Sequence, residues 1–182
     1  MQKVYSKPGD IYLPYAYDST VHYEEENTEK IYDVCAVGLE YGHRVQLMDE
    51  LRRRGLRCHI STGPIFDEYR KIYSQSHIGI NWSSLNDLNA RAFETPMMSI
   101  PVMNMVTDMV EFPAFSYCNL FESYNDGQDN SRWVMGAANI VTDTMNNLET
   151  KRKLNQEARE MLKGETYDAR ISQILDECGF GG

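Results

Sequence analysis

The chain has 182 residues, of which 42% are hydrophobic and 25% are charged, a composition typical of a folded globular protein. A chain of this length holds one domain with a sizeable core, but not two. Its formal net charge is −9, which counts against broad binding to nucleic acid or to an anionic membrane, because both need clustered positive charge. A local basic pocket for one phosphorylated ligand is compatible with this charge.

The sequence shows no targeting or membrane signal. The first ten residues lack the apolar segment of a signal peptide, and no run of about 18 apolar residues occurs, so we expect no membrane span. The four cysteines (Cys35, Cys58, Cys118 and Cys178) are far apart and form no C-x-x-C pair, which predicts reduced thiols in a cytoplasmic protein. Because the histidines lack metal-ligand spacing, we expect neither a metal nor a cofactor.

Residues 1–30 are polar, rich in Tyr and Glu, and punctuated by Pro8 and Pro14, which predicts an extended lead-in. Regular structure begins at residues 32–37, an apolar run that ends at Gly38 and is typical of a buried strand. Further strands are expected at residues 57–61, 77–82, 100–105 and 117–121, and helices at residues 43–54, 67–76 and 88–98.

The rest of the chain is predicted to be helical, with three apolar stripes that begin near Trp133, Leu154 and Ile171. Strands that alternate with helices through the first two-thirds imply a parallel sheet covered on both faces. We therefore predict an α/β fold: a single Rossmann-like domain over residues 31–182, with about five parallel strands and a C-terminal helical tail. In the helix at residues 67–76, we expect Phe66 and Tyr69 to point inward.

The turn after the first strand is one candidate site. Gly38 and Gly42 provide flexible backbone, and Arg44 follows within the first turn of a helix. In open parallel sheets, ligands bind beyond the carboxyl ends of the strands, where helix N-termini attract anions. A guanidinium at that position can hold a phosphate group with two hydrogen bonds. The alternative is a plain tight turn with Arg44 as a surface charge.

The loop after the third strand is a second candidate site. Asn81 ends that strand, and Ser83, Asn86 or a neighbouring side chain is placed to cap the next helix while leaving other N–H groups free for an anion. One turn into this helix, Arg91 and Glu94 lie three residues apart on neighbouring positions. They are either a surface ion pair or, because the helix is mostly apolar, partners for a polar ligand.

Other catalytic signatures are absent from the sequence. It contains no serine nucleophile elbow, P-loop or H-E-x-x-H motif. It also lacks the Asp-x-Asp pair that holds the metal of a metal-bound sugar nucleotide. Catalytic residues are therefore left unassigned.

The segment Glu94–Val102 resembles the E-A-M-A-x-G-x-P-V motif of group-1 glycosyltransferases of the GT-B class. Within it, Arg91–Glu94 is similar to the R-x-F-E of the spore-maturation, CgeB-like branch. Four more segments are similar to that branch and follow its order along the chain: residues 12–18, 32–38, 73–81 and 166–170.

The resemblance implies the C-terminal, donor-binding half of a glycosyltransferase, which holds a nucleoside-diphosphate sugar without a metal. By position, Glu94 would bind the two ribose hydroxyls, Arg44 would match the basic residue that faces the diphosphate, and Arg91 would match the family's arginine one turn before the glutamate. The implied reaction transfers the sugar to an acceptor that the sequence does not identify. Charge on the leaving diphosphate would be stabilised by arginine and by helix dipoles.

Three residues depart from the family pattern: Ser99 replaces the motif glycine, Asn86 replaces the glutamate that contacts the sugar, and Glu165 replaces the closing histidine. The resemblance also covers only the donor-binding half. We therefore expect turnover to need an acceptor domain, a partner chain or a homo-oligomer, with exposed Trp82 and Leu85 as interface residues. The alternative is a non-catalytic nucleotide-binding or interaction module derived from such an enzyme.

Overall fold

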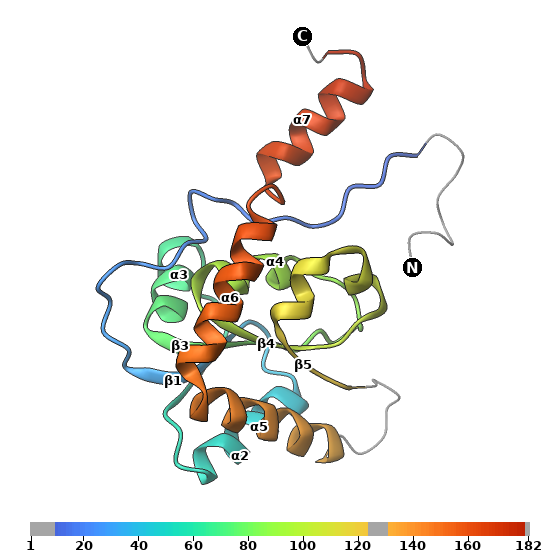
Figure 1. Ribbon diagram of the computed structural model, residues 1–182. Helices are drawn as coiled ribbons and strands as arrows, with labels where there is room; N and C mark the ends of the chain where they lie inside the picture. The colour runs from blue at the N-terminus through green and yellow to red at the C-terminus, as the bar shows by residue number, and fades with distance from the viewer. Residues whose placement is uncertain (1–9, 124–130, 181–182) are drawn as a thin grey trace.

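The computed structural model describes residues 10–123 and 131–180, and these form one α/β domain around a five-stranded parallel sheet (Figure 1). The strand order is β2-β1-β3-β4-β5. The strands are β1 (Tyr32–Val37), β2 (Cys58–Ser61), β3 (Ser76–Asn81), β4 (Ile100–Asn104) and β5 (Asn119–Phe121). The predicted fold class, with helices on both faces and a helical tail, is confirmed.

Six α-helices and two 3₁₀ turns accompany the sheet within the described ranges. They are α2 (Gly42–Arg53), α3 (Phe66–Ser74), α4 (Ala90–Met98), η1 (Thr107–Glu111), η2 (Pro113–Tyr117), α5 (Ser131–Asn146), α6 (Leu148–Leu162) and α7 (Tyr167–Glu177). The predicted elements are present, with ends shifted by one or two residues, but η1 and η2 were not predicted. None of the helices in the described ranges is long and apolar enough to span a membrane.

Helices cover both faces of the sheet, and successive side chains of a strand point alternately into the two layers between the sheet and these helices. In β1, Val34 and Ala36 pack in the core layer shared with α2 and α5, whereas Cys35 and Val37 pack with α3. The chain runs from β1 outward to β2 and then returns to the other side of β1 to form β3. The carboxyl ends of β1 and β3 therefore flank the topological switch point, where doubly wound folds bind ligands.

Gly79 in β3 lets α3 and α4 approach the sheet closely. A Cβ atom at this position would lie 2.6 Å from each of three atoms: Ser99 Oγ, Thr95 Cγ2 and Tyr73 Cε1. All three neighbouring residues are fully or almost fully buried, so none can swing away into solvent. The bare backbone of Gly79 thus sets the depth at which the helix carrying Arg91 and Glu94 packs.

We predict that Gly79→Ala lowers the free energy of unfolding by about 1–3 kcal/mol, because it overpacks this layer. Chemical denaturation monitored by circular dichroism measures the change. Gly136→Ala in α5 is the matched control, since a Cβ there meets nothing within 4 Å, and it should stabilise the protein by about 0.5–1 kcal/mol. Equal effects of the two changes would refute the packing role of Gly79.

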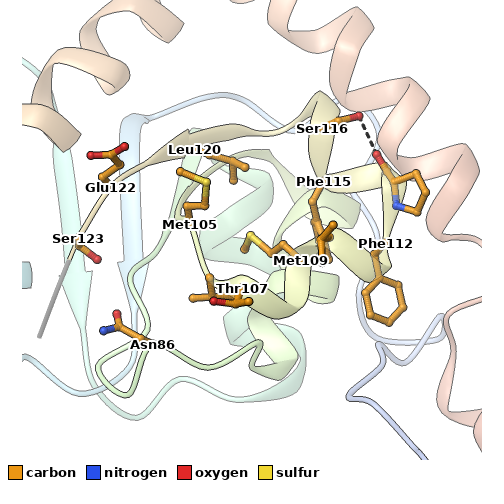
Figure 2. Close-up of a pocket in the computed structure, with 13 residues that line it drawn as sticks. Asn86, Met105, Thr107, Met109, Phe112, Phe115, Ser116, Leu120, Glu122 and Ser123 are labelled. Carbon is orange, nitrogen blue, oxygen red and sulfur yellow. Dashed lines mark hydrogen bonds between the residues drawn. The ribbon is translucent and has the colours of Figure 1, made fainter. Parts of the chain in front are cut away.

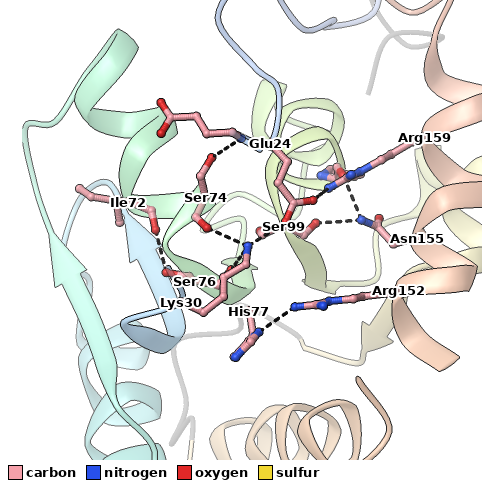
Figure 3. A network of polar contacts seen from close by, with 12 residues as sticks. Glu24, Lys30, Ile72, Ser74, Ser76, His77, Ser99, Arg152, Asn155 and Arg159 are labelled. Carbon is pink, nitrogen blue, oxygen red and sulfur yellow. Dashed lines mark hydrogen bonds and ion pairs between the residues drawn. The ribbon is translucent and has the colours of Figure 1, made fainter. Parts of the chain in front are cut away.

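The lead-in lies against the domain and is fastened by a polar network (Figure 3). Glu24 accepts hydrogen bonds from Lys30 Nζ and from the Arg159 guanidinium, both at 2.7 Å. Lys30 Nζ also donates to the carbonyl of Ser74 at the end of α3, and Arg159 donates to the carbonyl of Pro96 in α4. Glu24 therefore joins the lead-in to α3, α4 and α6. The boundary at residue 30 between the lead-in and the Rossmann-like domain stays a prediction.

Burial alone would raise the pKa of Glu24, but the Lys30 hydrogen bond and the Arg159 charge outweigh it and lower the pKa below its ordinary value of 4.5. A lowered carboxyl pKa stabilises the fold above the ordinary value, and this contribution is lost as the pH falls through the folded pKa. Glu24→Gln should therefore destabilise the protein by about 1 kcal/mol at pH 7, and the difference from wild type should shrink below about pH 4.5. Thermal melts across this pH range measure the stability difference, and Glu26→Gln, at an exposed position of the same segment, is the control.

Two expectations about exposed and buried aromatic residues were wrong. Phe66 is 67% exposed; it is the first residue of α3 and has a positive φ of +49°, outside the helical range. Trp82 is 3% exposed and packs edge-on against Phe121 in the core, so it forms no surface. Leu85, by contrast, is 76% exposed, as expected.

Candidate functional site

Arg44 ties together the two loops at the switch point. Its guanidinium donates to the carbonyl of Leu39 after β1 at 2.8 Å, and twice to the carbonyl of Trp82 after β3, at 2.5 and 3.1 Å. Arg44 is only 8% exposed, so the reading of this residue as a surface charge is wrong. Three of its contacts are with the main chain, which makes Arg44 a residue that positions the two loops.

Arg91 reaches from the first turn of α4 to the backbone of Gly38. A Cβ atom on Gly38 would lie 2.5 Å from Arg91 Nη2 and 2.9 Å from Arg91 Cζ, and Gly38 adopts a φ of +134° that favours glycine. Within the described ranges, the structure gives Arg91 no hydrogen bond and no ion pair. The half-buried guanidinium therefore lies at the end of β1 with its donors available.

Glu94 and Arg91 form no ion pair with each other, so the alternative of a surface ion pair is wrong. Instead Glu94 Oε2 accepts a hydrogen bond of 3.0 Å from the Tyr69 hydroxyl. Burial raises the pKa of Tyr69 well above its ordinary value, so this hydroxyl keeps its proton. His22 Nδ1 accepts from the main-chain N–H of Asp18 and places Nε2 3.7 Å from Glu94 Oε1. Glu94 is thus held in a fixed orientation.

Glu94 and Arg91 line one open pocket of about 580 Å³. Its other walls come from three places: the lead-in with His22, the turn after β2 with Ile65 and Phe66, and the start of α7. Ile65 and Phe66 are 65% and 67% exposed, so the pocket combines a carboxylate, a guanidinium and bare apolar side chains. The size is within the range of small-molecule sites in proteins.

The N-terminus of α4 opens into the same pocket. Asn89 is the N-cap residue, but its side chain does not cap the helix; its Oδ1 accepts from Asn81 Nδ2 at 3.0 Å. The first N–H groups of α4 thus have no side-chain acceptor, and the positive end of the helix dipole faces the pocket. The predicted caps before this helix are wrong, because the loop is held by other bonds.

The remaining predicted residues lie at three different places. Ser83 is buried: its N–H donates to Asn104 Oδ1, and its hydroxyl bonds the Asp87 carboxylate. Asn86 is exposed, has a φ of +52°, and lines a separate pocket beyond β4 and β5. Gly42 opens α2 with nothing within 4 Å of a would-be Cβ, so no contact requires glycine there. The structure therefore brings together only some of the eight predicted residues.

Positive charge is concentrated where Arg44 and Arg91 meet. Burial, and then the nearby charge of Arg91, lower the pKa of Arg44. Both residues border a small space of about 10 Å³ whose described lining residues include no carboxylate. An anion bound to Arg91 would offset this mutual repulsion. Across the described ranges, no three His, Cys, Asp or Glu side chains gather to hold a metal ion.

Sequence reasoning missed Tyr69 and His22 as partners of Glu94. Tyr69 was expected only to point inward, which its 7% exposure confirms. His22 lies in the lead-in, more than 70 residues from Glu94, and no spacing rule connects the two positions. Only the fold of the lead-in over α3 and α4 brings them together.

The fold and site define a doubly wound α/β domain with a basic residue and a fixed carboxylate at its switch point. Its structure is similar to that of a sucrose-phosphate synthase from Thermosynechococcus elongatus, with a TM-score of 0.60 and 12% sequence identity. The alignment covers 93% of this chain and 53% of the synthase chain, so this chain spans about half the length of that protein. At this identity the likeness shows the fold alone. No family model and no curated protein matches the sequence.

We predict that Gly38→Ala destabilises the protein by more than the roughly 1–3 kcal/mol of an unfavourable backbone conformation, because the new methyl group also displaces Arg91. Gly63→Ala is the matched control: Gly63 has a φ of +114°, but nothing lies within 4 Å of its Cβ position. Denaturant titrations compare the two variants. If Gly63→Ala costs as much, the contact with Arg91 contributes nothing.

Proposed function

We propose that this domain binds a nucleoside-diphosphate sugar and is the donor-binding half of a metal-independent GT-B glycosyltransferase of the CgeB-like branch. The observation that carries the proposal is that Arg91 and Glu94, three residues apart on α4, line the same pocket without forming an ion pair with each other. The likeness of the fold to half of a sucrose-phosphate synthase, a glycosyltransferase, supports it.

Glu94 is the proposed partner of the ribose. A carboxylate accepts up to about four hydrogen bonds, and the Tyr69 hydroxyl donates one of them to Glu94. Two neighbouring hydroxyls of a ribose match the remaining acceptor positions. The exposed ring of Phe66 and the side chain of Ile65, across the pocket, offer an apolar surface for the base.

Arg91 is the proposed partner of the diphosphate. Its guanidinium is free of carboxylates in the described part of the chain, lies against the bare backbone of Gly38, and adjoins the uncapped start of α4. Helix N-termini and guanidinium groups both favour phosphate oxygens. Arg44 is proposed to act indirectly: its hydrogen bonds hold the carbonyls of Leu39 and Trp82 and so position the two loops. The predicted contacts of Asn81, Gly42, Ser83 and Asn86 with the sugar nucleotide stay predictions; of these residues, Asn86 lines the separate pocket beyond β4 and β5.

Sugar transfer is a further proposal. The chain matches about half of the synthase, and we propose that turnover requires an acceptor domain, a partner chain or a second copy. The alternative is a module that binds the nucleotide without turnover, which the substitutions Asn86 and Ser99 favour. Release of free sugar from a sugar nucleotide by the isolated chain would exclude this alternative.

We predict that uridine or guanosine diphosphate raises the melting temperature, because a ligand at about 100 times its Kd adds about 2.7 kcal/mol to the stability. Inorganic pyrophosphate should give a smaller rise. Arg91→Gln should weaken the binding of both ligands. Glu94→Gln should weaken only the binding of the nucleotide, at least about tenfold, as expected for a hydrogen bond to a charged group. Differential scanning fluorimetry and calorimetric titration measure these effects.

Two surface substitutions control for charge and stability. Glu157→Gln and Arg53→Gln make the same chemical changes at exposed positions of α6 and α2, and both should leave ligand binding unchanged. The absence of a shift with every nucleoside diphosphate tested would overturn the proposal. Binding that persists equally in Glu94→Gln and Arg91→Gln would place the nucleotide elsewhere.

A further inference from the structure

A second pocket, of about 610 Å³, lies beyond the carboxyl ends of β4 and β5 (Figure 2). Its wall is mostly apolar and aromatic, and comes from η1, η2 and the ends of the two strands. Met105 and Val110 at its edge are 48% and 83% exposed, whereas Met109 and Phe115 on its floor are 7% and 1% exposed. Apolar pockets of this volume with a few polar groups are typical of small-molecule sites.

Three of the five polar side chains that line this pocket lie at one end; Thr107 lies between the ends, and the Ser116 hydroxyl, near Phe115, donates to the carbonyl of Pro113. In Figure 2, Asn86, Glu122 and Ser123 lie together, whereas Phe112 and Phe115 lie at the opposite end. Asn86 Oδ1 accepts from Asn104 Nδ2 at 3.3 Å, which leaves the amide N–H₂ of Asn86 to donate. The hydroxyl of Ser123 is buried and has no hydrogen-bond partner among the described residues. Such a group is normally satisfied by a partner.

These features select one class of ligand. A sugar would leave most of its hydroxyls without partners against methionine and phenylalanine. An anion would meet the exposed carboxylate of Glu122. An uncharged molecule with an aromatic or alkyl body and one hydroxyl group satisfies both ends: its body fills the apolar part, and its hydroxyl meets Ser123 and Asn86.

The two pockets adjoin one loop. Asn86, on the loop from β3 to α4, lines this pocket, while Asn89 on the same loop lines the pocket of Arg91 and Glu94. We propose that the pocket of Figure 2 binds a neutral aryl or alkyl alcohol. This binding does not depend on the nucleotide proposed for the pocket of Arg91 and Glu94.

The probe for the test is 2-naphthol, which is uncharged at pH 7, with 2-naphthoate as its anionic counterpart. Backbone amide shifts in two-dimensional NMR follow each titration. We expect saturable binding of 2-naphthol, with shifts confined to residues 105–123 and the loop near Asn86, and at least tenfold weaker binding of 2-naphthoate. Ser123→Ala should weaken 2-naphthol about three- to tenfold, the range expected for one neutral hydrogen bond.

Met105→Glu places a charge in the pocket mouth at a residue that is already half exposed, and should weaken 2-naphthol at least tenfold. Met161→Glu, on α6, is the matched control, because Met161 is 47% exposed and does not line the pocket. Met105→Glu should keep the response to nucleoside diphosphate, and Glu94→Gln should keep 2-naphthol binding. The failures of the two proposals are therefore distinguishable.

Three outcomes would overturn the proposal. The first is the absence of saturable 2-naphthol binding, and the second is equal binding by wild type and Met105→Glu. The third is a wild-type chain that forms a dimer which Met105→Glu dissociates, since the pocket would then be closed by a second copy. Sedimentation velocity on both proteins reports the third outcome.

Discussion

The contact between the Arg91 guanidinium and the bare backbone of Gly38 is the constraint on which the candidate site depends. It requires the positive φ of Gly38 and the close approach of α4 that Gly79 permits. Glu94, three residues later on the same helix, is held instead by Tyr69 and lies near His22. One short helix thus presents two opposite charges to one pocket without an ion pair between them.

The loop from β3 to α4 is held by its own hydrogen bonds and contributes residues to two different pockets. At its start, the Trp82 carbonyl is fixed by Arg44, and in its middle the Ser83 and Asp87 side chains bond each other. These internal bonds leave Asn86 and Asn89 facing two different pockets. A loop fixed by its own side chains can separate two sites rigidly, whereas a mobile loop would merge them.

Much of the fold could be predicted from the sequence, because runs such as residues 32–37 are apolar throughout and end at glycine, and because strands and helices alternate. The short turns η1 and η2 could not, since residues 107–117 carry no helical period long enough to recognise. Glu94 and Arg91 were found through motif and spacing. The burial of Trp82, the main-chain role of Arg44 and the pairing of Glu94 with His22 depend on contacts between distant segments, which local patterns do not encode.

Helix α7 extends from the body of the domain, as Figure 1 shows, and none of its residues is buried. Its start is held by the Thr166 side chain, which caps the N–H of Ala169, and by the main chain of Tyr17. A helix of 11 residues without a packed face is marginal in water. Its amide protons should therefore exchange with solvent deuterium far faster than those of α4. Slower exchange in α7 would then report that something has covered Ile171, Ile174 and Leu175.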